Sequence, residues 1–158
     1  TRVRSSAASD VYKRQVSLHS APKNILVIGL SSGSWVRALT YSNVFEKIDV
    51  VEINHGYLDL IKKYPEHSKI FTDPRVTIHI DDGRRWLYRS KNKYDLILMN
   101  TTFHWRSYIS NLVSSDFLKI IKSHLNPGGV VYYNTTATAG CTGSIRNYSQ
   151  LLLVATSS

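Results

Sequence analysis

Two kinds of segment alternate along most of the chain. Short apolar or alternating runs predict five β-strands, at residues 24–29, 47–53, 75–80, 94–99 and 130–133. Apolar residues at helical spacing predict four helices between them, at residues 34–42, 54–64, 82–89 and 115–125. Strands that alternate with helices form βαβ units. The pattern therefore predicts an α/β fold, a doubly wound and mostly parallel sheet with helices on both faces.

The two ends of the sequence fit this pattern less well. Residues 1–15 have no strand or helix periodicity, no initiator Met and no apolar core of a signal peptide, so we interpret them as a non-native or disordered leader. Residues 16–158 then form a single domain. Residues 151–156 are apolar enough for one more strand, but the length after residue 134 is too short for a further helix and a strand pair. We therefore expect a sheet that is incomplete at both ends.

Composition narrows the class of protein. The chain has 158 residues, of which 42% are hydrophobic, and this excludes a disordered chain. No apolar run approaches the roughly 20 residues that span a bilayer. The net charge of +9 includes four basic residues of the leader, and the other basic residues are scattered, so we expect a mildly basic surface and no nucleic-acid partner.

Cysteine and histidine positions bear on redox state and metals. Cys141 is the single cysteine, which excludes a disulfide scaffold and a cysteine-rich zinc site. One free thiol fits a reducing compartment, so we expect a cytoplasmic location. The histidines have no metal-ligand spacing with acids or cysteine, and we predict no metal site.

The loop after the first strand is the first candidate for ligand binding, because open α/β sheets bind ligands outside the carboxyl ends of their strands. Gly29 suits a tight turn, and Gly33 would let a ligand approach the backbone of this loop without a Cβ in the way. A dinucleotide fingerprint needs glycine where Ser31 and Ser34 stand, which argues against NAD and FAD. A plain strand–helix turn remains the alternative.

Acidic residues follow the second and third strands. Glu52 lies 23 residues after Gly29, where a carboxylate can accept hydrogen bonds from both ribose hydroxyls; a surface salt bridge is the alternative. Asp82 could accept the adenine amino group while the next backbone N–H, that of Gly83, contacts a ring nitrogen. Asp is also a preferred helix N-cap, and the two roles of Asp82 are compatible.

Together these loops resemble the S-adenosylmethionine-binding, Rossmann-like fold of class I methyltransferases, and more specifically the spermidine synthase (polyamine aminopropyltransferase) family. The segments that carry the resemblance are ILVIGLSSGS, DVVEIN, DPRVTIHIDDGRRWL, KYDLILMN and LNPGGVVYYN. The resemblance implies that S-adenosylmethionine, its decarboxylated form or a thioether product is bound. The binding residues that it implies are Gly29, Leu30, Ser31, Gly33, Glu52, Ile53, Asp82, Gly83 and Asn100.

Two departures from the family concern its acidic residues. Ser32 stands where the family carries an Asp that contacts the aminopropyl end. After the fourth strand the family has an Asp-Ser/Thr-Ser/Thr-Asp run that holds the diamine, and this chain has Asn100-Thr101-Thr102-Phe103. A diamine must lose a proton before its nitrogen can attack, and Asn100 and Phe103 supply no base. We therefore expect the catalytic Asp pair to be lost, which argues against spermidine synthesis itself.

Residues 103–106 offer different chemistry. His104 can serve as a general base, since histidine ordinarily titrates near pH 6.5, and Arg106 can hold a carboxylate or phosphate. Together with Asn100 and Thr101 they form the predicted catalytic set, for a small anionic or neutral acceptor. Alternatively, Phe103 and Trp105 cap the end of the sheet, and His104 and Arg106 are only solvated.

Two functions remain open from the sequence. The first is a transferase that moves a methyl or aminopropyl group from an adenosyl sulfonium to an unidentified acceptor. The second is a catalytically inactive nucleotide-binding remnant or interaction domain, as part of a longer, membrane-attached protein whose cytoplasmic portion this chain would be. Members of the family often pair as homodimers, and the sequence leaves open whether this chain does.

Overall fold

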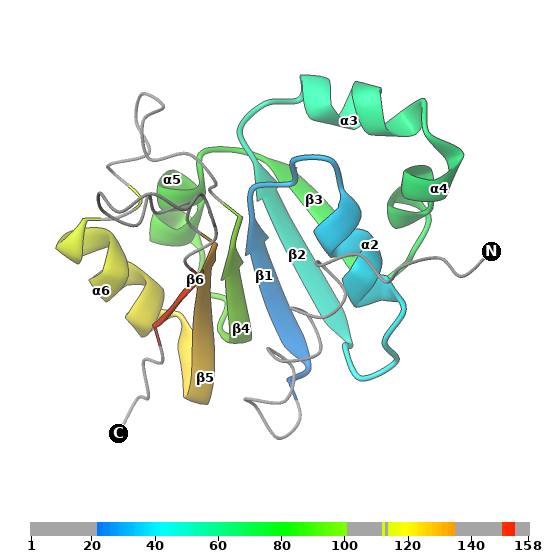
Figure 1. Ribbon diagram of the computed structural model, residues 1–158. Helices are drawn as coiled ribbons and strands as arrows, with labels where there is room; N and C mark the ends of the chain where they lie inside the picture. Colours follow the sequence, from blue (N-terminus) through cyan, green and yellow to red (C-terminus); the bar gives the residue numbers. More distant parts are fainter. Residues whose placement is uncertain (1–21, 101–111, 113, 135–149, 154–158) are drawn as a thin grey trace, which may run out of the picture.

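The computed structural model describes residues 22–100, 112, 114–134 and 150–153. Its strands form one sheet in the order β3-β2-β1-β4-β5-β6, in which the first five strands are parallel and β6 is antiparallel to β5 (Figure 1). The strands are β1 (Asn24–Ile28), β2 (Lys47–Glu52), β3 (Val76–Ile80), β4 (Tyr94–Met99), β5 (Leu125–Asn134) and β6 (Gln150–Leu153). The predicted doubly wound, mostly parallel sheet is therefore confirmed.

Helices cover both faces of this sheet (Figure 1). They are α2 (Ser34–Thr40), α3 (Gly56–Lys62), α4 (Pro65–Ser68), the 3-10 helix η1 (Lys69–Phe71), α5 (Gly83–Arg89) and α6 (Ser115–Ser123). Buried residues of α2, α3 and η1 belong to one apolar cluster, and those of α5 and α6 to another. The four predicted helices are all present, each shorter than predicted.

The segment after β2 differs most from the prediction. The sequence predicted a helix over residues 54–64, for which Asn54 is a possible N-cap, but α3 starts at Gly56 with His55 as its N-cap. The Asn54 side chain instead accepts a hydrogen bond from Gly56 N at 3.0 Å, which forms a local turn. A second short helix, α4, then begins at Pro65, a residue whose fixed φ suits the first turn of a helix.

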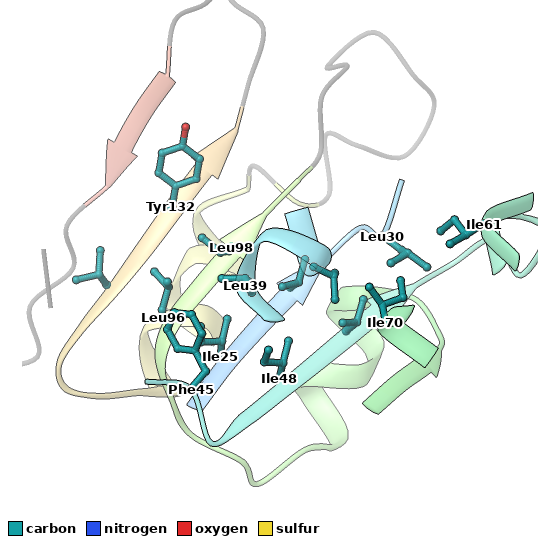
Figure 2. Packing of buried hydrophobic residues seen from close by; sticks show 14 residues of the cluster. Ile25, Leu30, Leu39, Phe45, Ile48, Ile61, Ile70, Leu96, Leu98 and Tyr132 are labelled. Atoms are coloured by element: carbon teal, nitrogen blue, oxygen red, sulfur yellow. The ribbon is translucent and has the colours of Figure 1, made fainter. Parts of the chain in front are cut away.

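Alternate residues of the central strands point into the two apolar clusters. Ile25, Val27, Leu96 and Leu98 pack under α2 and η1, on the face that Figure 2 shows. The residues between them on the strands pack under α5 and α6. A strand buried on both faces is apolar at most positions, which explains the apolar runs at residues 25–28 of β1 and 96–99 of β4. β3 is an edge strand, and its residues are only half-buried or exposed.

Arg75 ties the start of β3 to the end of α2. Its guanidinium donates to the carbonyl oxygens of Thr40 at 2.7 Å and Ser42 at 2.6 Å, and it pairs with Asp73 at 2.7 Å. Carbonyl groups at a helix end have no partner within the helix, so this side chain satisfies them. The hydrogen bond from Arg75 holds the pKa of Asp73 below its usual range. The Asp-Pro-Arg segment before β3 thus has a structural role.

Asp49, in the middle of β2, is a buried carboxylate with partners from three strands. It accepts hydrogen bonds from Tyr94 OH at 2.9 Å and Lys47 Nζ at 2.9 Å, and its Oδ1 lies 3.0 Å from Nε2 of His79. Burial opposes ionisation of Asp49, but these three hydrogen bonds together outweigh it and leave its pKa below the usual value. Burial of the Tyr94 hydroxyl raises the pKa of Tyr94 above its usual value.

We expect Asp49→Asn to lower the free energy of unfolding by roughly 2–4 kcal/mol at pH 7, because an amide cannot accept from all three donors. A carboxylate with a lowered pKa stabilises the fold above its ordinary pKa and loses that contribution as the pH falls through the folded-state value. Urea unfolding between pH 7 and pH 3 measures this effect. The difference in the free energy of unfolding between wild type and variant should shrink below about pH 4.

Asp59→Asn is the matched control, since Asp59 is exposed and lies 3.8 Å from Lys62 in a surface ion pair. It should change the free energy of unfolding by less than about 1 kcal/mol. A gap between wild type and Asp49→Asn that stays constant from pH 7 to pH 3 would show that ionisation of Asp49 does not stabilise the fold.

Candidate functional site

The site lies where the carboxyl ends of β1, β2 and β4 meet. β1 is the middle strand of the three, with β2 on one side and β4 on the other, so the chain connections diverge here. Gly29 N donates to Val51 O at 2.8 Å, and Asn100 N donates to Ile28 O at 2.8 Å. Such a switch point is where open α/β sheets bind ligands.

Gly29 turns the chain out of β1, as predicted. Its φ is +94°, in the region that favours glycine. A Cβ at this position would lie 2.9 Å from the carbonyl oxygen of Asn100. The Asn100 side chain reaches back toward Gly29, with Nδ2 3.4 Å from Gly29 O. Glycine is therefore required both for the turn and for the close approach to the end of β4.

The structure explains the glycine at position 33 differently from the prediction. We expected its missing side chain to leave room for a ligand. A Cβ there would instead point at the core, 3.2 Å from Cδ1 of both Ile61 and Ile70. The Gly33 N–H donates to Leu30 O at 2.9 Å, which closes the turn. The prediction about Gly33 was wrong in its cause, because this glycine makes room for side chains of α3 and η1.

Glu52 joins the two loops of the site. It ends β2 and is 5% exposed. Its Oε2 accepts from Leu30 N at 2.7 Å and from Ser31 N at a long 3.4 Å, and its Oε1 accepts from Asn54 N at 2.8 Å. Glu52 lies against the loop after β1, as expected, and among the described residues it forms no salt bridge. The three backbone contacts were not predicted, because a sequence does not reveal which N–H groups a carboxylate meets.

Asp82 is the N-cap of α5, one of its two predicted roles. Its Oδ1 accepts from Arg85 N at 2.9 Å. Asp81, the residue before it, accepts from Asp82 N at 2.7 Å and forms an ion pair with the Arg85 side chain. Asp81 and Arg85 were missed as site residues, although their four-residue spacing is the signal of an ion pair at a helix start.

Ile53 and Gly83 flank these acids. The Ile53 side chain is 70% exposed directly beyond β2, and Ile80 at the end of β3 is also exposed. Gly83 is buried, and a Cβ on it would lie 2.7 Å from Cγ2 of Ile28. The absent side chain of Gly83 thus lets the start of α5 pack on β1, while its N–H belongs to the first turn of the helix.

The structure describes the site on one side only. Thr101, His104 and Arg106, the predicted acceptor residues, lie outside the described residues, as does Cys141. Asn100 is the last described residue on that side. Across the described part of the chain, no cluster of three His, Cys, Asp or Glu side chains is placed to ligate a metal. In the same residues, no helix has the length and apolar character needed to span a bilayer.

Comparison with known proteins bears on the family. Residues 8–152 match the model of the spermine/spermidine synthase domain. A polyamine aminopropyltransferase of Clostridium perfringens is 42% identical over 81 residues, which cover 51% of this chain and 29% of that protein. Spermine synthase of Arabidopsis thaliana is 36% identical over 114 residues, 71% of this chain and 32% of that protein. The chain thus spans about a third of the length of these relatives.

Solved structures show the same fold. A spermidine synthase in complex with the transition-state analogue AdoDATO superposes with a TM-score of 0.71 and 27% identity, covering 77% of this chain and 42% of that one. Human methyltransferase-like protein 13 in complex with SAH gives a TM-score of 0.66 at 22% identity, covering 80% of this chain and 63% of that one, which supports the fold alone. The family match and the sheet order agree, and the chain belongs to the spermine/spermidine synthase domain family.

Proposed function

We propose that this domain binds an adenosyl sulfonium at the carboxyl ends of β1–β3 and donates its aminopropyl group to a small acceptor. The observation that carries the proposal is the placement of Glu52, a buried carboxylate held between the loop after β1 and the start of the β2–α3 connection. The residues assigned to the nucleoside are Glu52, Ile53 and Asp82, which we call the nucleoside site.

Glu52 suits a ribose because its carboxylate retains acceptor capacity. A carboxylate offers about four acceptor positions. Two are taken by short contacts with Leu30 N and Asn54 N, and a third by the long 3.4 Å contact with Ser31 N. One hydroxyl can therefore bind Oε1 directly, and the other can replace the weak contact at Oε2. The backbone donors fix the orientation of the carboxylate before the ligand arrives.

The adenine ring needs an apolar surface and a polar edge. The exposed Ile53 side chain supplies an apolar surface next to Glu52. Asp82, at the end of the neighbouring strand, can accept from the adenine amino group through the carboxylate oxygen that does not cap α5. The N–H of Gly83 lies in the first turn of α5, where helix donors lack partners within the helix. Two carboxylate acceptors, one N–H donor and an apolar side chain together fit a nucleoside.

Transfer itself is a direct displacement. The lone pair of the acceptor forms a bond to the carbon next to the sulfonium, the carbon–sulfur bond breaks, and the thioether leaves with its electron pair. An amine acceptor also gives up one proton. We assign contact with the acceptor to Asn100, Thr101, His104 and Arg106, with His104 as the base. The similarity to proteins named polyamine aminopropyltransferase supports decarboxylated S-adenosylmethionine as the donor. S-adenosylmethionine is the alternative donor, because Ser32 stands where the family resemblance implies an Asp that contacts the aminopropyl end.

A second candidate is a domain that binds the nucleoside without transfer. It is favoured by Asn100, a neutral residue where the family resemblance implies an acid. Its amide lies against Gly29 O at the end of β4, next to the expected position of the sulfur. A neutral side chain there removes one charge that would attract and deprotonate a diamine.

The test has a binding stage and a turnover stage. Thermal unfolding is followed with S-adenosylmethionine, its decarboxylated form and 5′-methylthioadenosine, each at millimolar concentration. A ligand at 100 times its dissociation constant stabilises the folded state by about 2.7 kcal/mol, so the unfolding midpoint should rise, most with the decarboxylated form. Formation of 5′-methylthioadenosine is then measured with amine and carboxylate-bearing acceptors. No midpoint shift with any ligand overturns the proposal, and binding without turnover favours the second candidate.

A further inference from the structure

We propose that Arg85 is a positioning residue for adenine recognition: it holds Asp81 so that the Asp82 carboxylate faces the 6-amino group of the base. The inference rests on the proposed function, which assigns Asp82 to adenine. The inference adds Arg85, which contacts no ligand itself. By orienting Asp82, Arg85 increases the preference of the site for a 6-amino base over its 6-oxo analogue.

Three donors converge on one oxygen of Asp81. Oδ1 accepts from the backbone N–H of Asp82 at 2.7 Å, and from both Nε and Nη2 of Arg85. The backbone N–H of Arg85 in turn donates to Oδ1 of Asp82 at 2.9 Å. Arg85 is thus connected to Asp81 through its side chain and to Asp82 through its main chain, and these contacts fix the turn between β3 and α5.

The Asp81–Arg85 ion pair also offsets the negative charge of the acids around it. Asp81 N donates to the carbonyl oxygen of Glu52 at 3.2 Å, so Asp81 and Asp82 lie beside a third acid at one edge of the sheet. The hydrogen bond from the Arg85 side chain is the main reason that the pKa of Asp81 lies below its usual range. With its guanidinium engaged on Asp81, Arg85 neutralises the neighbour of Asp82 without covering Asp82 itself.

The free oxygen of Asp82 decides what the site selects. Among the described residues, the hydrogen bond that Asp82 accepts is at Oδ1, which leaves Oδ2 for the base. An ionised carboxylate only accepts hydrogen bonds. It pairs with the 6-amino group of adenine and repels the 6-oxo group of hypoxanthine. Loss of Arg85 lets the turn relax and so reduces the preference for the amino base.

The experiment compares two ligands by calorimetry, 5′-methylthioadenosine and 5′-methylthioinosine. Wild type should bind the adenine compound about tenfold more tightly or better, because the oxo compound leaves the Asp82 carboxylate unpaired. Arg85→Gln should weaken binding of the adenine compound roughly threefold to tenfold and lower the preference by the same factor. Arg85→Lys keeps the charge without the planar fork, and it should restore part of the preference.

Arg89→Gln is the matched control, since Arg89 lies one turn further along α5 and is exposed, its side chain forms no hydrogen bond in the described part of the chain, and it acts on Asp81 only through its charge. It should leave the preference unchanged. The double variant Asp81→Asn/Arg85→Gln should bind no more weakly than Arg85→Gln, because Arg85 acts through Asp81.

Two results contradict the inference in different ways. If Arg85→Gln weakens both ligands equally, or changes neither, Arg85 does not position Asp82 and the inference fails while the proposed function stands. If wild type binds neither ligand, the proposed function fails, and the inference fails with it. Arg85 is largely exposed, so its variants should fold, and urea unfolding of each variant checks this.

Discussion

Glu52→Gln is expected to destabilise the domain by roughly 2–4 kcal/mol and to weaken binding of adenosyl ligands roughly 10- to 100-fold. The carboxylate accepts from Leu30 N on one oxygen and from Asn54 N on the other. The amide of Gln keeps one acceptor and replaces the other with an NH₂ group. Whichever way the amide is turned, its NH₂ group faces the backbone N–H of either Leu30 or Asn54. The ribose also loses an acceptor.

Urea unfolding and calorimetry with 5′-methylthioadenosine measure the two effects separately. Glu46→Gln is the control, because Glu46 is a glutamate directly before β2 whose exposed side chain pairs with Lys23 at the surface. It should change stability by less than about 1 kcal/mol and leave affinity unchanged. Unaltered ligand affinity in a folded Glu52→Gln protein would remove Glu52 from the nucleoside site.

The central strands were predictable because burial leaves them few alternatives. The range 94–99 matches β4 at both ends, and β1 ends one residue before the predicted boundary. Both strands have neighbours on either side and helices on either face, so most of their positions are apolar, with the buried Asp95 of β4 as an exception. The alternation of strands and helices predicted a doubly wound, mostly parallel sheet, which the structure has, whereas the strand order is known only from the structure.

Residues with two compatible roles were harder to predict. Gly33 follows a glycine-turn pattern, and only the packed structure shows Ile61 and Ile70 in the space that its side chain would fill. Asn54 looked like a helix cap because Asn is a preferred capping residue, yet its backbone N–H is bound by Glu52 and its side chain turns the chain before α3. Local propensity does not decide between such uses; contacts between distant segments do.

The nucleoside site was easier to anticipate than its supporting contacts. Position at the carboxyl end of a predicted strand was enough to single out Glu52 and Asp82, because carboxyl ends of parallel strands meet at one edge. The Asp81–Arg85 pair is visible only as a spacing in sequence, and such a spacing is common on surface helices. The structure gives it a role through the shared oxygen of Asp81.

Gly29→Ala is expected to lower the free energy of unfolding by roughly 3–5 kcal/mol, more than a positive φ alone explains. A side chain in the left-handed region costs about 1–2 kcal/mol. At Gly29 the added Cβ would also lie 2.9 Å from the backbone oxygen of Asn100, so β4 or the loop must shift. That shift moves Leu30 N away from Glu52, and affinity for adenosyl ligands should fall together with stability.

Gly128→Ala separates these two causes. Gly128 has a φ of +75°, close to that of Gly29, but a Cβ there meets nothing within 4 Å. The control should therefore show the conformational cost alone, about 1–2 kcal/mol in urea unfolding, with unchanged ligand affinity. The difference between the two variants measures the close approach of the loop after β1 to the end of β4. Equal losses in the two variants would mean that this approach is loose, and the site would then lack the rigid corner on which recognition of the sugar by Glu52 depends.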